Sequence, residues 1–182
     1  MNISKNKINV VIFSHIYFDA TFSWGKNLFN NYEDWLIETI RTLKNNKNVN
    51  LILKVHPSNI SKDKSKDNLS REIVSLKKAF GEIPSELKII SADTKINTIS
   101  IIKLIDVCIT VRGTVGIESA IFNKFVITAG SGRYDNLGFT KDFIIKKNYL
   151  RFLKNLSQKD IINNNHSRAL NFGYYNIYKR VF

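Results

Sequence analysis

Residues 106–119, Asp-Val-Cys-Ile-Thr-Val-Arg-Gly-Thr-Val-Gly-Ile-Glu-Ser, contain the transition that decides the fold. Residues 106–111 are mostly apolar and β-branched, which is typical of a strand buried on both faces of a sheet. Arg112 and Gly113 follow directly, Gly113 favours a tight turn, and a helical pattern then extends to Phe122. A strand that leads into a glycine turn and a helix predicts one unit of a parallel α/β sheet.

The same alternation extends over the rest of the 182 residues. Apolar runs predict strands over 8–14, 49–55, 87–90, 106–111, 125–129 and 143–145. Apolar residues at helical spacing predict helices over 31–43, 69–80, 98–104, 149–156 and 159–182, besides the one that reaches 122. We therefore expect one Rossmann-like α/β domain over 1–182, with a parallel sheet, helices on both faces and residues 157–182 as a C-terminal packing helix.

Composition restricts the class of protein. With 43% hydrophobic and 24% charged residues the chain is typical of a globular protein. It contains no apolar run of the length of about 18 residues that a membrane-spanning helix needs, and its first residues lack a secretory signal. Cys108, the only cysteine, lies within an apolar run, so a disulfide framework is excluded and a buried core thiol is expected. We expect a cytoplasmic protein.

The formal net charge of +13 favours anionic ligands, either phosphorylated small molecules, polyanions or an anionic membrane surface. The basic residues alternate with Asp and Asn along the chain and form no stripe. We therefore expect no nucleic-acid partner, whereas peripheral attachment at the inner face of the cytoplasmic membrane stays open.

Ligands of open parallel sheets bind beyond the carboxyl ends of the strands, where the strand order reverses. This rule selects the loop after Ser14, the His56-Pro57 turn, the Gly113 turn and the loop at Gly130.

The Gly113 turn carries the strongest local signal. The free amides and the positive dipole of the helix start suit a phosphate, and Thr114 offers either a hydroxyl donor or a cap. Gly116 permits close approach of a ligand or of a neighbouring strand. Glu118, expected in the first turn, either accepts hydrogen bonds from ribose hydroxyls or only complements the helix dipole.

Histidines end two of the predicted strands. His56 either donates to a phosphate oxygen, acts as a base, or has a structural role beside Pro57. His15 and Asp19 either orient each other or belong to loop packing. One cysteine and three scattered histidines do not match a zinc site, and neither a Walker motif nor a GxGxxG fingerprint is present.

Several of these stretches, taken in order, carry a family resemblance. They are Ser14-His15 with Asp19, residues 32–36, Leu53-Lys54-Val55-His56-Pro57, residues 112–118, residues 128–134, and Gly138-Phe139-Thr140. Over roughly residues 8–156 the chain resembles the capsule polysaccharide and surface carbohydrate biosynthesis family of bacterial GT-B-type glycosyltransferases. The resemblance implies one lobe of a GT-B fold, the C-terminal lobe that holds the nucleotide sugar.

The resemblance also implies roles for residues. Its donor-binding set is His56, Arg112, Gly113, Thr114, Val115, Gly116, Glu118, Gly130, Arg133 and Tyr134. His56 would contact the donor phosphate, and Arg133 would neutralise the leaving phosphate. The candidate catalytic residues are His15, Asp19 and His56. Such enzymes use a nucleotide sugar as substrate and need neither a bound metal nor a further cofactor.

A complete GT-B enzyme has two lobes, so we expect a glycan or lipid-linked acceptor to bind through an N-terminal lobe that is missing here, and we expect the lone lobe to be inactive. The loops around residues 15–24 and 130–140 carry Tyr17, Phe18, Phe22, Trp24, Tyr134 and Phe139. This aromatic content predicts loops that are mobile, self-associate or bind a second polypeptide. The alternatives are a related nucleotide-sugar epimerase and a non-catalytic binding or assembly module.

Overall fold

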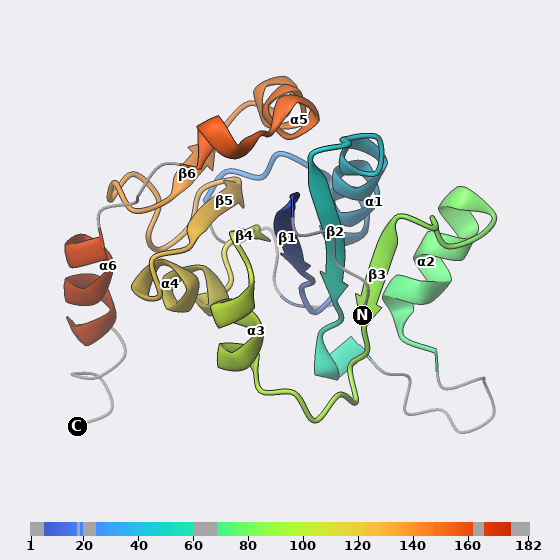
Figure 1. Ribbon diagram of the computed structural model, residues 1–182, viewed down its shortest axis with the longest axis horizontal. Helices are drawn as coiled ribbons and strands as arrows, with labels where there is room; N and C mark the ends of the chain where they lie inside the picture. Colours follow the sequence, from blue (N-terminus) through green and yellow to red (C-terminus); the bar gives the residue numbers. More distant parts are fainter. Residues whose placement is uncertain (1–5, 18, 20–24, 60–68, 162–165, 176–182) are drawn as a thin grey trace.

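The strands of the described residues form one parallel sheet in the order β3-β2-β1-β4-β5-β6 (Figure 1). The computed structural model describes residues 6–17, 19, 25–59, 69–161 and 166–175. The strands are β1 Ile8–Phe13, β2 Val49–Lys54, β3 Leu87–Ile90, β4 Val107–Thr110, β5 Phe125–Ala129 and β6 Lys141–Phe143. Each neighbouring pair runs parallel, which confirms the predicted sheet.

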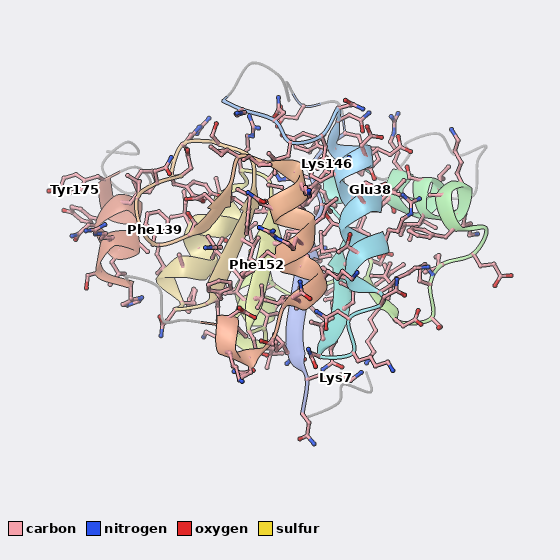
Figure 2. The ribbon with its side chains drawn as sticks, turned by 90° about the horizontal axis from the view of Figure 1, so that it is seen from above. Lys7, Glu38, Phe139, Lys146, Phe152 and Tyr175 are labelled. Carbon is pink, nitrogen blue, oxygen red and sulfur yellow. The ribbon has the colours of Figure 1, made fainter. Side chains whose placement is uncertain are left out.

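Helices cover both faces of the sheet, as predicted. They are α1 Tyr32–Leu43, α2 Arg71–Phe80, α3 Thr98–Leu104, α4 Thr114–Ile121, α5 Lys146–Asn155 and α6 His166–Gly173, with 3-10 turns η1 Pro57–Asn59 and η2 Gln158–Asp160. Alternate residues of β1 point to opposite faces. Val10 and Ile12 pack with α1, α2 and α5, whereas Val11 and Phe13 pack with α3, α4 and α6. Figure 2 shows α1 and α5 side by side over the first of these faces.

Local signals set the helix ends where the sequence predicts them. The Oδ1 atom of Asn31 accepts a hydrogen bond of 2.7 Å from the N–H of Asp34 and so caps α1. Gly81, at φ 79°, ends α2 in a conformation that favours glycine. Cys108 is fully buried, and burial raises the pKa of its thiol to about 12, which confirms its place in the core.

Two predicted elements near the C-terminus are wrong in their bounds. The sixth strand covers Lys141–Phe143 instead of 143–145, because Asp142 accepts hydrogen bonds from the hydroxyls of Thr128 and Thr140, while Ile144 and Ile145 are exposed. The helix expected over 159–182, within the C-terminal segment 157–182, is interrupted. Asp160 pairs with Ser157 to close the η2 turn, Ile161 is not helical, and α6 begins at His166.

The aromatic residues of the 130–140 loop do not form a free surface. Tyr134 and Phe139 are buried, and their rings pack against each other and against Phe172 of α6. Figure 2 shows Phe139 in the part of the molecule next to α6. Tyr134 and Phe139 therefore do not contribute to the expected mobile, self-associating or partner-binding surface, because α6 covers them. Phe18, Phe22 and Trp24 lie outside the described residues.

Candidate functional site

A cleft of about 480 Å³ opens at the carboxyl ends of β1, β2 and β4, where the strand order reverses. Its wall combines the residues after β1, the His56-Pro57 turn, the segment after β3 and the start of α4. The lining residues are Phe13, Ser14, His15, Ile16, Asp19, Lys54, Val55, His56, Pro57, Ala92, Thr94, Ile96, Thr98, Thr110, Gly113, Thr114, Val115 and Glu118. The structure thus brings together residues from three of the four predicted segments.

His15 is held firmly between β4 and α1. Its Nε2 atom accepts the main-chain N–H of Val111 at 3.1 Å and lies 2.9 Å from Oγ1 of Thr110. Its ring stacks on Tyr32 at a centroid distance of 4.3 Å. Burial, then the charges of Arg112 and His56, lower the pKa of His15 to about 3. The imidazole is therefore neutral, and its proton lies on Nδ1.

His56 has the opposite tautomer. Its Nδ1 atom accepts the main-chain N–H of Ser58 at 3.1 Å, which leaves the proton on Nε2. Burial lowers the pKa of His56, with a smaller opposing effect of Glu72, a further lowering by Lys54 and an opposing effect of Asp19. A neutral, half-buried imidazole in the cleft wall is thus a hydrogen-bond donor through Nε2.

Asp19 and His15, for which the sequence left mutual orientation and loop packing open, lie at the same cleft. Asp19 lines the same cleft, is exposed, and its carboxylate raises the pKa of His56. The contacts that orient His15 include those with Val111, Thr110 and Tyr32. The structure therefore brings His15, Asp19 and His56 to one cleft, with main-chain and aromatic contacts orienting His15.

The start of α4 forms a second wall. Gly113 is the N-cap and has no side chain with which to satisfy the first-turn amides, so the N–H groups of Thr114 and Val115 are the donors that the helix geometry leaves for a ligand. The hydroxyl of Thr110 accepts the Gly113 N–H at 3.2 Å and fixes the turn. Glu118 lines the cleft from the second turn, not from the first turn as expected, because α4 begins at Thr114.

A cation at the end of β2 lies in the cleft wall. Lys54 is 7% exposed, and its Nζ donates to the carbonyls of Val55 at 2.8 Å and Ser91 at 3.2 Å. Burial lowers its pKa, and Glu72 and Asp93 oppose this. Sequence reasoning missed Lys54, Thr110 and Thr98 as lining residues. A lysine at the end of a mostly apolar strand, two residues before His56, is the signal that could have found the first of them.

The other half of the predicted donor set lies outside the cleft wall. A side chain at Gly116 would collide with Tyr134, whose buried hydroxyl donates to the carbonyl of Gly113 at 2.7 Å. Gly130, at φ 138°, lies against the carbonyl of Lys26. The guanidinium of Arg112 donates to Asn27, and Arg133 is exposed on the loop. Gly116 and Tyr134 thus shape the turn from behind.

Within the described residues no group of three or more His, Cys, Asp or Glu is arranged to hold a metal ion. No described helix is long and apolar enough to cross a membrane.

A family model described as capsule polysaccharide biosynthesis protein matches residues 1–176. Compared by sequence with curated proteins, the chain matches none.

Solved structures with a similar fold include two from Thermosulfurimonas dismutans KpsC. The β-Kdo 2,7 transferase has a TM-score of 0.53 at 19% identity, over 98% of this chain and 57% of that one. The β-Kdo 2,4 transferase has a TM-score of 0.52 at 20% identity, over 84% and 44%. S. aureus MnaA, in a co-structure with UDP, has a TM-score of 0.52 at 14% identity, over 97% and 47%. The chain thus spans about half the length of these structures.

Proposed function

The chain belongs to the family of capsule polysaccharide biosynthesis proteins, and from this premise we propose that it is the nucleotide-sugar-binding lobe of a glycosyltransferase for a bacterial surface polysaccharide. The observation that carries the proposal is the convergence of His56 Nε2–H, the open start of α4 and the Glu118 carboxylate on one cleft at the switch point of the sheet. His56 Nε2–H and the start of α4 suit a phosphate, and the Glu118 carboxylate suits the hydroxyls of a ribose.

The phosphate is assigned to the space between His56 and α4. The N–H groups of Thr114 and Val115 and the positive end of the α4 dipole favour an anion there. A neutral histidine donates to such an anion without having to be protonated first. The buried Lys54 ammonium adds positive potential from the wall of the cleft.

These groups act on the leaving group. In glycosyl transfer the bond between the anomeric carbon and the phosphate oxygen breaks, and the electron pair stays on the phosphate. Fixed donors already aimed at that oxygen stabilise the charge as it develops. We assign this role to His56 Nε2–H and the α4 amides, with Glu118 holding the ribose hydroxyls and so fixing the donor in register.

The acceptor hydroxyl must lose a proton in the same reaction. Nε2 of His15 is occupied by Val111, and a pKa of about 3 is too low for an efficient base near neutral pH. We therefore assign His15 to shaping the cleft through its Nδ1–H donor. Asp19, an exposed carboxylate at the cleft, is the group that we place nearest the acceptor.

Similarity to only about half the length of each neighbour supports an acceptor site on a part that this chain does not match. MnaA was solved with UDP, which supports a nucleotide as the ligand of this lobe. Transfer itself then needs the acceptor-binding part, whereas nucleotide binding does not.

Isothermal titration of the purified chain with CMP, UDP and GDP and with their sugar conjugates tests the proposal. We expect saturable binding of at least one nucleotide with a 1:1 stoichiometry and a matching rise in melting temperature, since a ligand at 100 times its Kd adds about 2.7 kcal/mol of stability. Absence of binding at millimolar concentrations of every nucleotide would overturn it. Epimerisation of a nucleotide sugar without any acceptor would favour the epimerase instead.

A further inference from the structure

Glu72 is a fully buried carboxylate in the first turn of α2, behind the cleft. Its Oε1 atom accepts hydrogen bonds from three donors: Oγ of Ser14 at 2.5 Å, Nδ2 of Asn59 at 2.7 Å and the main-chain N–H of His56 at 3.3 Å. Taking a carboxylate out of water is costly unless its partners are well placed. The burial of the Glu72 carboxylate therefore needs a structural explanation.

The donors belong to the two strand ends that carry the histidines of the cleft. Ser14 directly follows β1 and precedes His15, and its Oγ also accepts the His56 N–H at 2.7 Å. Asn59 lies in η1, and its Nδ2 also donates to the carbonyl of His15 at 2.7 Å. One carboxylate oxygen thus ties the main chain on either side of His15 to the main chain of His56.

The ties restrict both imidazoles. The His15 backbone is fixed between Ser14 and Asn59, and the His56 backbone is fixed by Ser14 and Glu72 itself. Each ring then meets a main-chain N–H, Val111 for His15 and Ser58 for His56, that selects its tautomer. A small rotation of either strand end would lengthen these bonds and release the ring.

We propose that Glu72 is a positioning residue, whose buried carboxylate holds the ends of β1 and β2 so that His15 and His56 present fixed Nδ1–H and Nε2–H donors to the ligand in the cleft. The inference rests on the proposed nucleotide-binding function for its purpose, but the arrangement of the rings is testable without any ligand. The charged groups that act on His56 are Glu72, Lys54 and Asp19, and the Glu72 carboxylate raises the pKa of His56. This effect supplies a second, independent signal of its role.

Two substitutions separate the parts of this role. Glu72→Gln keeps the size and the Oε1 acceptor but removes the charge, whereas Glu72→Ala removes both. Glu82→Gln, at an exposed glutamate just beyond α2, serves as the matched control. Ring 15N and 13C NMR signals of His15 and His56 report tautomer and pKa in the free protein, and nucleotide titration reports the consequence for binding.

We expect Glu72→Gln to fold and to lower the pKa of His56 measurably, with the Nε2–H tautomer retained. In Glu72→Ala, where it folds, we expect the tautomer signals of both rings to mix and nucleotide affinity to fall roughly tenfold or more, about the effect of losing a hydrogen bond to a charged group. Glu82→Gln should match the native protein in every readout.

Unchanged ring signals and an unchanged His56 pKa in Glu72→Gln would overturn the proposal, even if stability fell, because a merely structural residue would behave in that way. If the native chain binds no nucleotide, the proposed function fails, but the NMR readout still decides whether Glu72 positions the rings. If nucleotide binds equally well to Glu72→Ala and to the native protein, the positioning role fails and the proposed function stands.

Discussion

The main-chain N–H of Val111 donates a 3.1 Å hydrogen bond to Nε2 of His15. This bond joins the residue after β4 to the residue after Ser14, across the point where the strand order reverses. Protonation of His15 Nε2 would remove the acceptor of this bond and place a second N–H group opposite that of Val111. The bond and the burial of the ring therefore act together to keep the imidazole neutral in the folded protein.

This arrangement predicts a pH dependence of stability. The pKa of His15 is about 3 in the folded chain against an ordinary value of 6.5, so between these values the unfolded chain binds more protons. Stability is then present above about pH 6.5 and is lost as the pH falls toward 3, by roughly 1.4 kcal/mol per pH unit for one such group. Urea unfolding between pH 7 and pH 4.5 should show this slope, to which the lowered pKa of His56 adds in the same direction.

His15→Gln, which keeps an acceptor for Val111 but does not titrate, should flatten that slope. His166→Gln is the control, because His166 lies on α6 and does not line the cleft. An identical slope in His15→Gln and the native protein would show that the neutral imidazole does not limit stability at acidic pH.

Gly116 predicts an inverted effect of a common substitution. Gly→Ala inside a helix ordinarily stabilises by up to about 1 kcal/mol. At Gly116 the added Cβ would collide with the hydroxyl and ring of the buried Tyr134, so we expect Gly116→Ala to destabilise by about 1–3 kcal/mol. Tyr134→Phe in the same chain should recover part of the loss. Chemical unfolding of both single variants and the double variant measures this, and a stabilised Gly116→Ala would refute the close contact.

The turn at Gly113 could be predicted from the sequence because its signals are local. An apolar β-branched run, a glycine and a helical pattern are adjacent, and the structure has β4, the N-cap Gly113 and α4 in that order. The parallel order of the strands follows from the same alternation. The position of the cleft then follows from topology, since ligands of such sheets lie at the switch point.

The role of Glu72 could not be predicted in this way, because its partners are 13 and 58 positions away in the sequence. The sequence does contain a weak signal. Glu72 lies four residues before the buried Leu76 and three before the buried Ser75, which places a carboxylate on the inward face of α2.

The prediction of a strand over 143–145 is wrong for a related reason. Exposed Ile144 and Ile145 have the composition of a strand, but hydrogen bonds to Asp142 decide where β6 lies.

His56 should contribute to ligand affinity far more than to folding. His56 lies just after β2 and lines the cleft, and the hydrogen bond from Ser58 to its Nδ1 atom leaves the proton on Nε2. His56→Ala should weaken nucleotide binding by roughly 1.5–3 kcal/mol, the range for a hydrogen bond to a charged group. Calorimetry and thermal unfolding of His56→Ala and His166→Ala compare the two effects. Unchanged affinity with a large loss of stability would assign His56 a structural role.

Glu118 predicts discrimination between ribose and deoxyribose. Its carboxylate lines the cleft from the second turn of α4, where the interaction with the helix dipole is already weak. If it accepts a hydrogen bond from a ribose hydroxyl, a nucleotide should bind the native chain roughly tenfold or more tightly than its 2′-deoxy form. Glu118→Ala should weaken the ribonucleotide most, so that the ratio of the two affinities approaches one. Titration of both nucleotides into both proteins closes a cycle that isolates this contact. If the ratio of the two affinities is unchanged in Glu118→Ala, the ribose contacts another group. If Glu118→Ala lowers only the stability of the protein, Glu118 does not contact the ligand.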